Sequence, residues 1–506
     1  MIIEKGTEIS IEDVARTAIH GEIIELGESA VSSIETAHQR LIRIAGSGKP
    51  VYGINTGFGI FANKKINDAE TLQLNRNLIL SHAVGTGKPL DERIVRASMF
   101  IRAVTLAKGY SGVRPVIIKT LLDMLNKGVV PIIPEKGSLG SSGDLCQLSH
   151  LALVLSTDLA DLEEESGKAK FKGKVLSGKQ AMSDAGINRI VLTTKEGLAL
   201  NNGATFSAAI AALSIYEAEY LLHVAEIAAA LSMEALCARS IAFDDRVHQA
   251  RKQIGQIKTA KTIRELTNGS TFIDSLNQVQ DAYSIRCMPQ IVGAIRDTHT
   301  YVKSIIEREI NAATDNPLIF EPEDAISGGN FHGEPIGLVC DYLSIALCEL
   351  GAVSERRTYR LTDENTNNGL PPMLVDNPRS AGLNSGLMMP QYTAASLVLE
   401  NQTLATPDSI RSLPTSASQE DHNANAMTAA RHTYEIIQNL RQILSIELYT
   451  AVRGIELRRR VSKGNLGVGT TEAYDKISQV VTYKDNDTLW GHEIQKINEM
   501  IEKRIL

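Results

Sequence analysis

The chain has 506 residues, and its 52 lysines and arginines stand against 59 aspartates and glutamates, for a net charge of −7. Hydrophobic residues make up 43% and charged residues 22%, which is typical of a globular protein with a substantial core. This balance argues against a disordered chain and against a polycationic nucleic-acid-binding protein.

The cysteines and the first residues indicate a cytoplasmic protein. The chain has five cysteines and no CxxC pair, which favours buried thiols in a reducing compartment over disulfides or a zinc site. Acidic residues run through the first 23 positions, where a signal peptide would need a basic and then an apolar stretch. The most apolar long segment, 206–236, contains four glutamates, so we expect a buried or interface helix and no membrane span.

Along the chain, the first 200 residues mix short helical patterns with loops rich in glycine and proline. Short strands are expected at 129–133 and 170–175. Beyond residue 200 the spacing of apolar residues predicts long helices over 202–236, 272–311, 335–361, 392–401 and 424–456. We therefore predict a mostly α protein, with a mixed N-terminal region at 1–200 and a helical bundle at 201–506 that together form one integrated unit. Helices that are apolar on more than one face also predict a homo-oligomer.

Residues 137–145, with the sequence GSLGSSGDL, carry the sharpest local signal. In one interpretation they form a tight turn in which Asp144 caps a following helix. In the other, the amide nitrogen of Gly143 attacks the carbonyl carbon of Ser141, and loss of water leaves an imidazolone ring with a methylidene group from Ser142. A side chain at position 143 would block that ring closure. The segment alone leaves both interpretations open.

The chain resembles the histidine, phenylalanine and tyrosine ammonia-lyase family, which forms 4-methylideneimidazole-5-one (MIO) from a tripeptide in such a loop. The family tripeptide is usually Ala-Ser-Gly, so Ser141 departs from it. Residues 146–150, CQLSH, depart from the commoner APLAH. The resemblance implies that MIO forms autocatalytically from Ser141, Ser142 and Gly143, and that no metal or diffusible cofactor is needed.

Two further motifs extend the resemblance through the first half of the chain. Residues 51–59, VYGINTGFG, are similar to the family's tyrosine loop, in which Tyr52 would remove the β-proton of the substrate. Residues 201–203 match a motif in which Asn202 would hydrogen-bond the imidazolone or the leaving amine, although Asn201 replaces a residue that is usually apolar. Seen alone, these would be a loop aromatic and a helix cap.

A polar face at 280–290 continues the resemblance. Gln280, Tyr283 and Arg286 recur at helical spacing, which could equally be a solvated surface. The family motif implies that Arg286 clamps the substrate carboxylate in a bidentate pair and that Gln280 and Tyr283 line the same pocket.

Two segments follow in the second half of the chain. Residues 328–335, GGNFHGEP, resemble a family segment whose phenylalanine, here Phe331, packs against the imidazolone. A glycine-rich loop before a helix is the plainer interpretation. Residues 414–422 match the family's carboxylate loop, which includes Glu420, whereas the continuation NANAM at 423–427 departs from the usual pattern.

Two positions bear on the substrate. His82 lies where phenylalanine-specific relatives tend to place an apolar or aromatic residue, and Glu420 is the histidine-type choice. Together they could hydrogen-bond the two nitrogens of an imidazole, whereas a phenyl ring would leave both unpaired. The resemblance thus implies elimination of ammonia from L-histidine to give trans-urocanate. A ring-methylated histidine, tyrosine and a 2,3-aminomutase outcome stay open.

The resemblance also implies the architecture. We expect a central bundle of the fumarase/aspartase-like type, assembled as a homotetramer whose active sites combine residues from three chains. Fumarase/aspartase-like lyases themselves are a rival class, but their GSSxMPxKxN signature is absent. A non-catalytic helical assembly protein would account for the helices and not for the joint presence of Tyr52, Ser142, Arg286 and Glu420.

Overall fold

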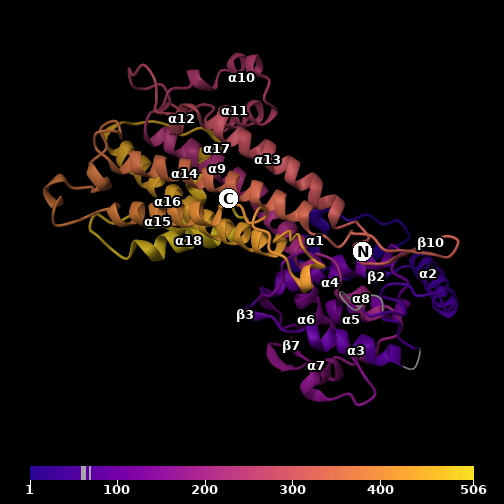
Figure 1. The fold of residues 1–506 in the computed structure, drawn as a ribbon. Coiled ribbons are helices and arrows are strands. Elements are labelled where there is room, and N and C mark those ends of the chain that lie inside the picture. Colours follow the sequence, from indigo (N-terminus) through magenta and orange to yellow (C-terminus); the bar gives the residue numbers. More distant parts are fainter. Residues whose placement is uncertain (58–63, 68–69) are drawn as a thin grey trace. The chain divides into compact units, whose positions relative to one another are not determined.

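The computed structural model describes residues 1–57, 64–67 and 70–506, and the chain forms two compact units (Figure 1). Phe58 and Gly59 of the predicted tyrosine loop lie outside the described residues. Each unit is built from three separate stretches of chain. The first comprises Met1–Tyr216, Lys303–Asp341 and Pro407–Arg431, and the second Glu217–Val302, Tyr342–Thr406 and His432–Leu506. A division near residue 200 stays a prediction.

The first unit contains the N-terminal helices, and α4 (Glu92–Ala107) lies in its core. All residues of α4 from Ala97 to Ala107 are buried, so this helix is covered on every side. The other helices of this stretch are α1 (Ile11–His20), α2 (Glu28–Gly46), α3 (Thr71–His82), α5 (Pro115–Lys127), α6 (Leu145–Leu155), α7 (Gly178–Asp184) and α8 (Glu196–Asn201).

The strands are short and pair in small sheets. Parallel pairs join β1 (Ile2–Ile3) to β2 (Glu25–Leu26) and β6 (Ser156–Thr157) to β9 (Ile190–Val191). Antiparallel pairs join β3 (Thr86–Pro89) to β5 (Pro134–Lys136), β10 (Leu318–Phe320) to β11 (Asp324–Ile326), and β4 (Val130–Pro131) to β7 (Lys168–Phe171) and on to β8 (Lys174–Ser177).

One expected strand, 170–175, is instead a hairpin. Lys172 and Gly173 both have positive φ, 48° and 77°, which is the two-residue turn geometry that matches the twist of antiparallel strands. The chain therefore reverses between β7 and β8, and the single-strand prediction is wrong.

Long helices dominate the rest of the chain, which confirms the predicted mostly α fold (Figure 1). Those predicted from apolar spacing are α9 (Thr205–Ala235), α13 (Met288–Glu309), α14 (Glu334–Thr362), α15 (Met388–Leu404) and α16 (Ala426–Val461). The remaining ones are α10 (Asp245–Arg251), α11 (Ile254–Leu266), α12 (Tyr283–Arg286), α17 (Val468–Val480) and α18 (Trp490–Glu502).

One of these helices begins later than expected. The prediction was a helix from residue 272, but residues 272–282 are not helical. Polar side chains there bond to other parts of the chain: Asp274 accepts from Ser240, and Asp281 accepts from the backbone amide of Arg239. Such side-chain bonds compete with helix formation.

A buried carboxylate ties three helices of the second unit together. Glu447 of α16 accepts hydrogen bonds from Ser232 of α9 at 2.8 Å and from Ser354 of α14 at 2.6 Å. It also forms a two-point ion pair with Arg357 of α14, and neither side chain is exposed. Removing one partner of this pair would leave an uncompensated buried charge and would destabilise the packing of these helices.

Two helices, α9 and α14, are long and apolar enough to cross a membrane by length and composition alone. In each, 72% of the apolar window is buried inside the protein. That burial is typical of core helices.

Candidate active site

The loop at residues 137–143 is shaped by glycines with positive φ. Gly140 has φ 70° and Gly143 has φ 80°. A Cβ atom on Gly143 would lie 2.0 Å from the carbonyl carbon of Gly203, so no other residue fits there. Gly143 and Gly203 form a parallel backbone bridge, and the amide of Asp144 donates to the carbonyl of Gly203 at 2.9 Å.

The side chain of Asp144 anchors the end of this loop through buried hydrogen bonds. Its side chain is fully buried and accepts hydrogen bonds from Ser138 Oγ at 2.7 Å and from the amide and hydroxyl of Ser207 at 2.8 and 2.9 Å. Burial raises the pKa of this carboxyl, and the hydrogen bonds from Ser207 and Ser138 oppose that rise. Asp144 stands at the N-cap position of α6, but its side chain makes no capping hydrogen bond to that helix, so the capping interpretation holds for the position alone.

Two donors meet the carbonyl oxygen of Ser142. The side-chain amide of Asn202 donates to it at 2.7 Å, and the backbone amide of Gly203 donates at 3.2 Å. Buried Arg102 holds this donor segment, because its guanidinium donates to the carbonyl oxygens of Ala199 and Asn202. The donors are thus in place without rearrangement of the chain.

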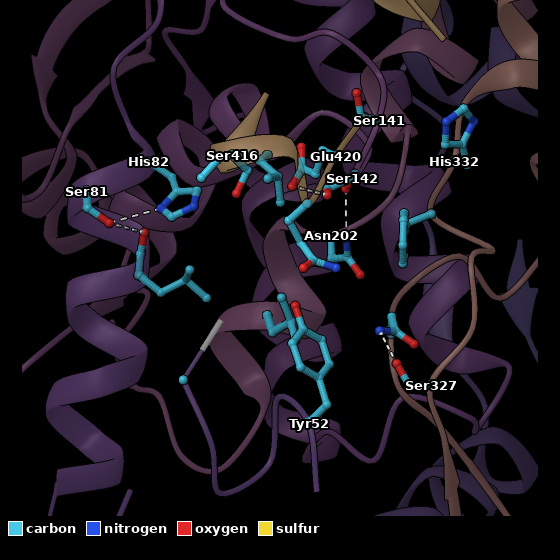
Figure 2. Close-up of a pocket in the computed structure, with 18 of the residues that line it drawn as sticks. Tyr52, Ser81, His82, Ser141, Ser142, Asn202, Ser327, His332, Ser416 and Glu420 are labelled. Carbon is cyan, nitrogen blue, oxygen red and sulfur yellow. Dashed lines mark hydrogen bonds between the residues drawn. The ribbon is translucent and has the colours of Figure 1, made fainter. Parts of the chain in front are cut away.

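A cavity of about 1140 Å³ lies beside this loop, within the first unit (Figure 2). The predicted site residues that line it are Tyr52, His82, Ser141, Ser142, Asn202, Phe331 and Glu420. Gly143 packs against Gly203. The tripeptide and the candidate ring-binding pair therefore share one cavity.

The carboxylate of Glu420 reaches the middle residue of the tripeptide. Ser142 Oγ donates to Glu420 Oε1 at 2.8 Å (Figure 2). Glu420 is held in a tight loop, since its backbone pairs with Thr415 through hydrogen bonds of 2.7 and 3.2 Å. Residues 416–418 inside this loop all have positive φ, between 51° and 66°. This backbone conformation is unusual for residues other than glycine.

The orientation of His82 follows from its neighbours at the end of α3. Ser81 Oγ lies 3.2 Å from the carbonyl oxygen of Leu78 and 2.9 Å from His82 Nδ1. When the Ser81 hydroxyl donates to Leu78, neutral His82 donates from Nδ1 to Ser81 and leaves Nε2 as an acceptor. Burial lowers the pKa of His82, while the Leu78 carbonyl and the charge of Glu420 raise it.

Tyr52 comes from a turn that is fastened from both sides. The side chain of Asn55 accepts from the amide of Val51 at 2.7 Å and donates to the carbonyl of Lys49 at 2.9 Å. Gly53 has φ 69°, and a Cβ atom there would lie 2.6 Å from Leu198. In Figure 2 the hydroxyl end of Tyr52 points toward the side of the cavity where Ser142 and Asn202 lie.

Three predicted residues belong to the second unit and are not among those lining the cavity. Gln280 and Tyr283 are exposed, and 68% of the Tyr283 surface is accessible. The guanidinium of Arg286 lies 4.7 Å from the centre of the Tyr283 ring, in α12. The described chain thus does not itself show their predicted role.

Some lining residues were not predicted from the sequence. Leu74, Asn77, Leu78 and Ser81 line the cavity with His82, and their spacing in α3 marks one helical face. That spacing was visible in the sequence. Others come from loops whose course the sequence does not reveal, among them Asn316, Ser327, His332 and Ser416. Within residues 1–57, 64–67 and 70–506, no three His, Cys, Asp or Glu side chains gather as a metal site would need.

Comparison with known proteins decides the family, since the model of the aromatic amino acid lyases matches residues 9–479. The chain belongs to the aromatic amino acid lyase family. This makes it a carbon–nitrogen lyase with an amino acid substrate. It is 45% identical to histidine ammonia-lyase of Treponema denticola over 498 residues, which are 98% of this chain and 96% of that protein.

Solved structures of the family have the same fold. Phenylalanine aminomutase of Pantoea agglomerans has a TM-score of 0.93 at 33% identity, covering 99% of this chain and 98% of that one. Histidine ammonia-lyase of Trypanosoma cruzi has a TM-score of 0.89 at 34% identity, covering 99% and 93%. The predicted family and fold are therefore both confirmed.

Proposed function

We propose that this lyase releases ammonia from L-histidine and forms trans-urocanate. One observation carries the proposal: the cavity that contains Ser142 of the tripeptide is also lined by His82 and Glu420, the two groups suited to bind an imidazole ring. The similarity to histidine ammonia-lyases supports the same substrate.

The tripeptide fits the MIO group that the family uses. Ring closure joins the Gly143 nitrogen to the Ser141 carbonyl carbon, and the carbonyl oxygen leaves as water with the hydrogens of the Gly143 and Ser142 amides. Ser142 then loses its hydroxyl and its Cα hydrogen as a second water. The absence of a Cβ at Gly143 and the two donors on the Ser142 carbonyl suit this chemistry. When formed, the group supplies an electrophilic carbon that makes the substrate amine a better leaving group.

Residues of the cavity then remove the β-proton of the substrate and stabilise the negative charge that develops. Tyr52 is the base for the β-proton, since its phenol points toward the tripeptide side of the cavity. Asn202 and the Gly203 amide stabilise negative charge on the Ser142 oxygen. Phe331 lines the same cavity and supports the tripeptide side of the site.

The ring subsite consists of two acceptors. His82 offers Nε2, and Glu420 offers carboxylate oxygens, one of which the Ser142 hydroxyl occupies until that hydroxyl is lost. Such a pair favours a ring with an N–H at both nitrogens. A methyl group on either ring nitrogen of histidine removes one hydrogen-bond donor. The phenol of tyrosine supplies one donor and the phenyl ring of phenylalanine supplies none. The subsite therefore prefers L-histidine.

The carboxylate of the substrate needs a cation to bind it. Arg286, with Tyr283 and Gln280, is the candidate, supplied by another copy of the chain in a homotetramer. The exposure of Gln280 and Tyr283 in the single chain supports a role at a subunit interface. Histidine breakdown in the cytoplasm is the proposed setting.

The test is to incubate purified protein separately with L-histidine, L-tyrosine, L-phenylalanine and the two N-methylhistidines. Urocanate absorbance and ammonia are read in parallel, and Ser142→Ala is the control. We expect both products from histidine and a kcat/KM at least about tenfold lower for either methylated ring. Release only from tyrosine or a methylhistidine would overturn the substrate, and a β-amino acid without ammonia would indicate an aminomutase.

A further inference from the structure

Asn423 connects two parts of the site that are far apart in the sequence. Its side-chain Nδ2 donates to Ser141 Oγ at 2.5 Å, across 282 residues of chain. The side-chain Oδ1 of Asn423 accepts from the backbone amide of Leu413 at 3.1 Å. The backbone amide of Asn423 donates to Ser412 Oγ at 2.9 Å. One side chain therefore holds both the tripeptide and the start of the loop that carries Glu420.

This link is buried. Asn423 is 1% exposed and Ser141 is 5% exposed. If either partner alone were replaced by an apolar residue, the other would remain as a buried polar group without its hydrogen bond. If both are replaced by apolar residues of similar shape, the penalty from this bond disappears, and the loss of the Leu413 contact is common to both Asn423 variants. The pair thus behaves as a unit, and its contribution can be isolated in a double-mutant cycle.

We propose that Asn423 is a positioning residue for maturation of the tripeptide. It holds Ser141 by the hydroxyl, which restricts the rotation of the residue whose carbonyl carbon receives the Gly143 nitrogen. This inference rests on the proposed cyclisation of Ser141, Ser142 and Gly143, and it concerns the speed at which that cyclisation proceeds.

The experiment follows loss of water from newly made protein. The wild type, Asn423→Leu, Ser141→Ala and the double variant are synthesised in a cell-free pulse, and their intact masses are read over time. Thermal unfolding is recorded for each. Asn401→Leu is the matched control, because Asn401 is an equally buried amide that pairs with Asn439 in the second unit.

We expect Asn423→Leu to slow the loss of two waters about tenfold when Ser141 is present and to have little further effect when Ala stands at 141. Asn401→Leu should lower the melting temperature and leave the rate of water loss unchanged. A wild type that never loses water would overturn the proposed cyclisation and this inference together. A wild type that matures, with Asn423→Leu maturing equally fast or slowed equally in both backgrounds, would overturn this inference alone.

Discussion

The side-chain amide of Asn202 donates a 2.7 Å hydrogen bond to the carbonyl oxygen of Ser142. The amide of Gly203 reaches the same oxygen at 3.2 Å, and the segment is held by buried Arg102. The tripeptide therefore faces a pair of donors that are fixed by the surrounding structure. Preorganised donors of this kind contribute most where negative charge develops during a reaction.

Replacing Asn202 should remove the stronger of these two donors. We expect Asn202→Ala to lower kcat by about 10² to 10³-fold with a small change in KM, because the lost bond acts mainly on developing charge. Steady-state kinetics with histidine measures this. Asn201→Ala is the control, since the neighbouring Asn201 bonds Ser149 and not the tripeptide. An equal loss in both variants would show that Asn202 has no specific role.

Tyr52 should carry the proton transfer. Tyr52→Phe keeps the ring in the cavity and removes the phenol, so we expect kcat to fall by about 10² to 10⁴-fold while the protein still loses two waters. Rate and intact mass are measured on the same preparation. Tyr110→Phe is the control, because Tyr110 packs on Phe320 and does not line the cavity. Wild-type kcat in Tyr52→Phe would exclude it as the base.

The acceptor at His82 should set the ring preference. In His82→Leu the substrate imidazole loses one partner, so kcat/KM for histidine should fall about 10- to 10²-fold, and the ratio of phenylalanine to histidine turnover should rise. Both substrates are assayed side by side, with the exposed His492→Leu as control. If the ratio does not move, His82 does not contact the ring.

Glu309 should make stability depend on pH. Burial raises the pKa of its carboxyl to about 7, and the nearby charge of Asp144 contributes to this rise. Between pH 4.5, the ordinary value, and pH 7 the folded protein keeps a proton that the unfolded chain has lost, so the stability linked to this group falls as pH rises through that range.

The variant Glu309→Gln removes this proton linkage. We expect it to increase the free energy of unfolding relative to wild type by up to about 3 kcal/mol at pH 8, and by much less at pH 5. Denaturant unfolding at the two pH values measures the difference, with Glu307→Gln on the same helix as control. An equal effect at both pH values would contradict the raised pKa.

Motifs in the sequence predicted several residues that line the cavity, but not which side chains contact one another. Seven of the residues predicted from motifs line the cavity, namely Tyr52, His82, Ser141, Ser142, Asn202, Phe331 and Glu420, whereas Gln280, Tyr283 and Arg286 do not. Motifs succeed here because each one specifies a residue type at a fixed place in the chain. They say nothing about which side chains touch.

Ser141 and Asn423 show that limit. Each was noted separately as a departure from the family pattern, but nothing in one sequence reveals that two residues 282 positions apart form a buried hydrogen bond. The same holds for the two units, each of which is assembled from three separate stretches of the chain. The hairpin at β7 and β8 was missed for a local reason, because the turn residues Lys172 and Gly173 were included in the strand.

The most direct test of the account is the intact mass of the purified, denatured protein, compared with that of Ser142→Ala. We expect the wild type to be lighter than its sequence by two water molecules, and Ser142→Ala, which lacks the hydroxyl, to be lighter than its own sequence by no more than one. A wild type with the full mass of its sequence would show that Ser141, Ser142 and Gly143 stay an ordinary peptide, and it would contradict the proposed catalysis.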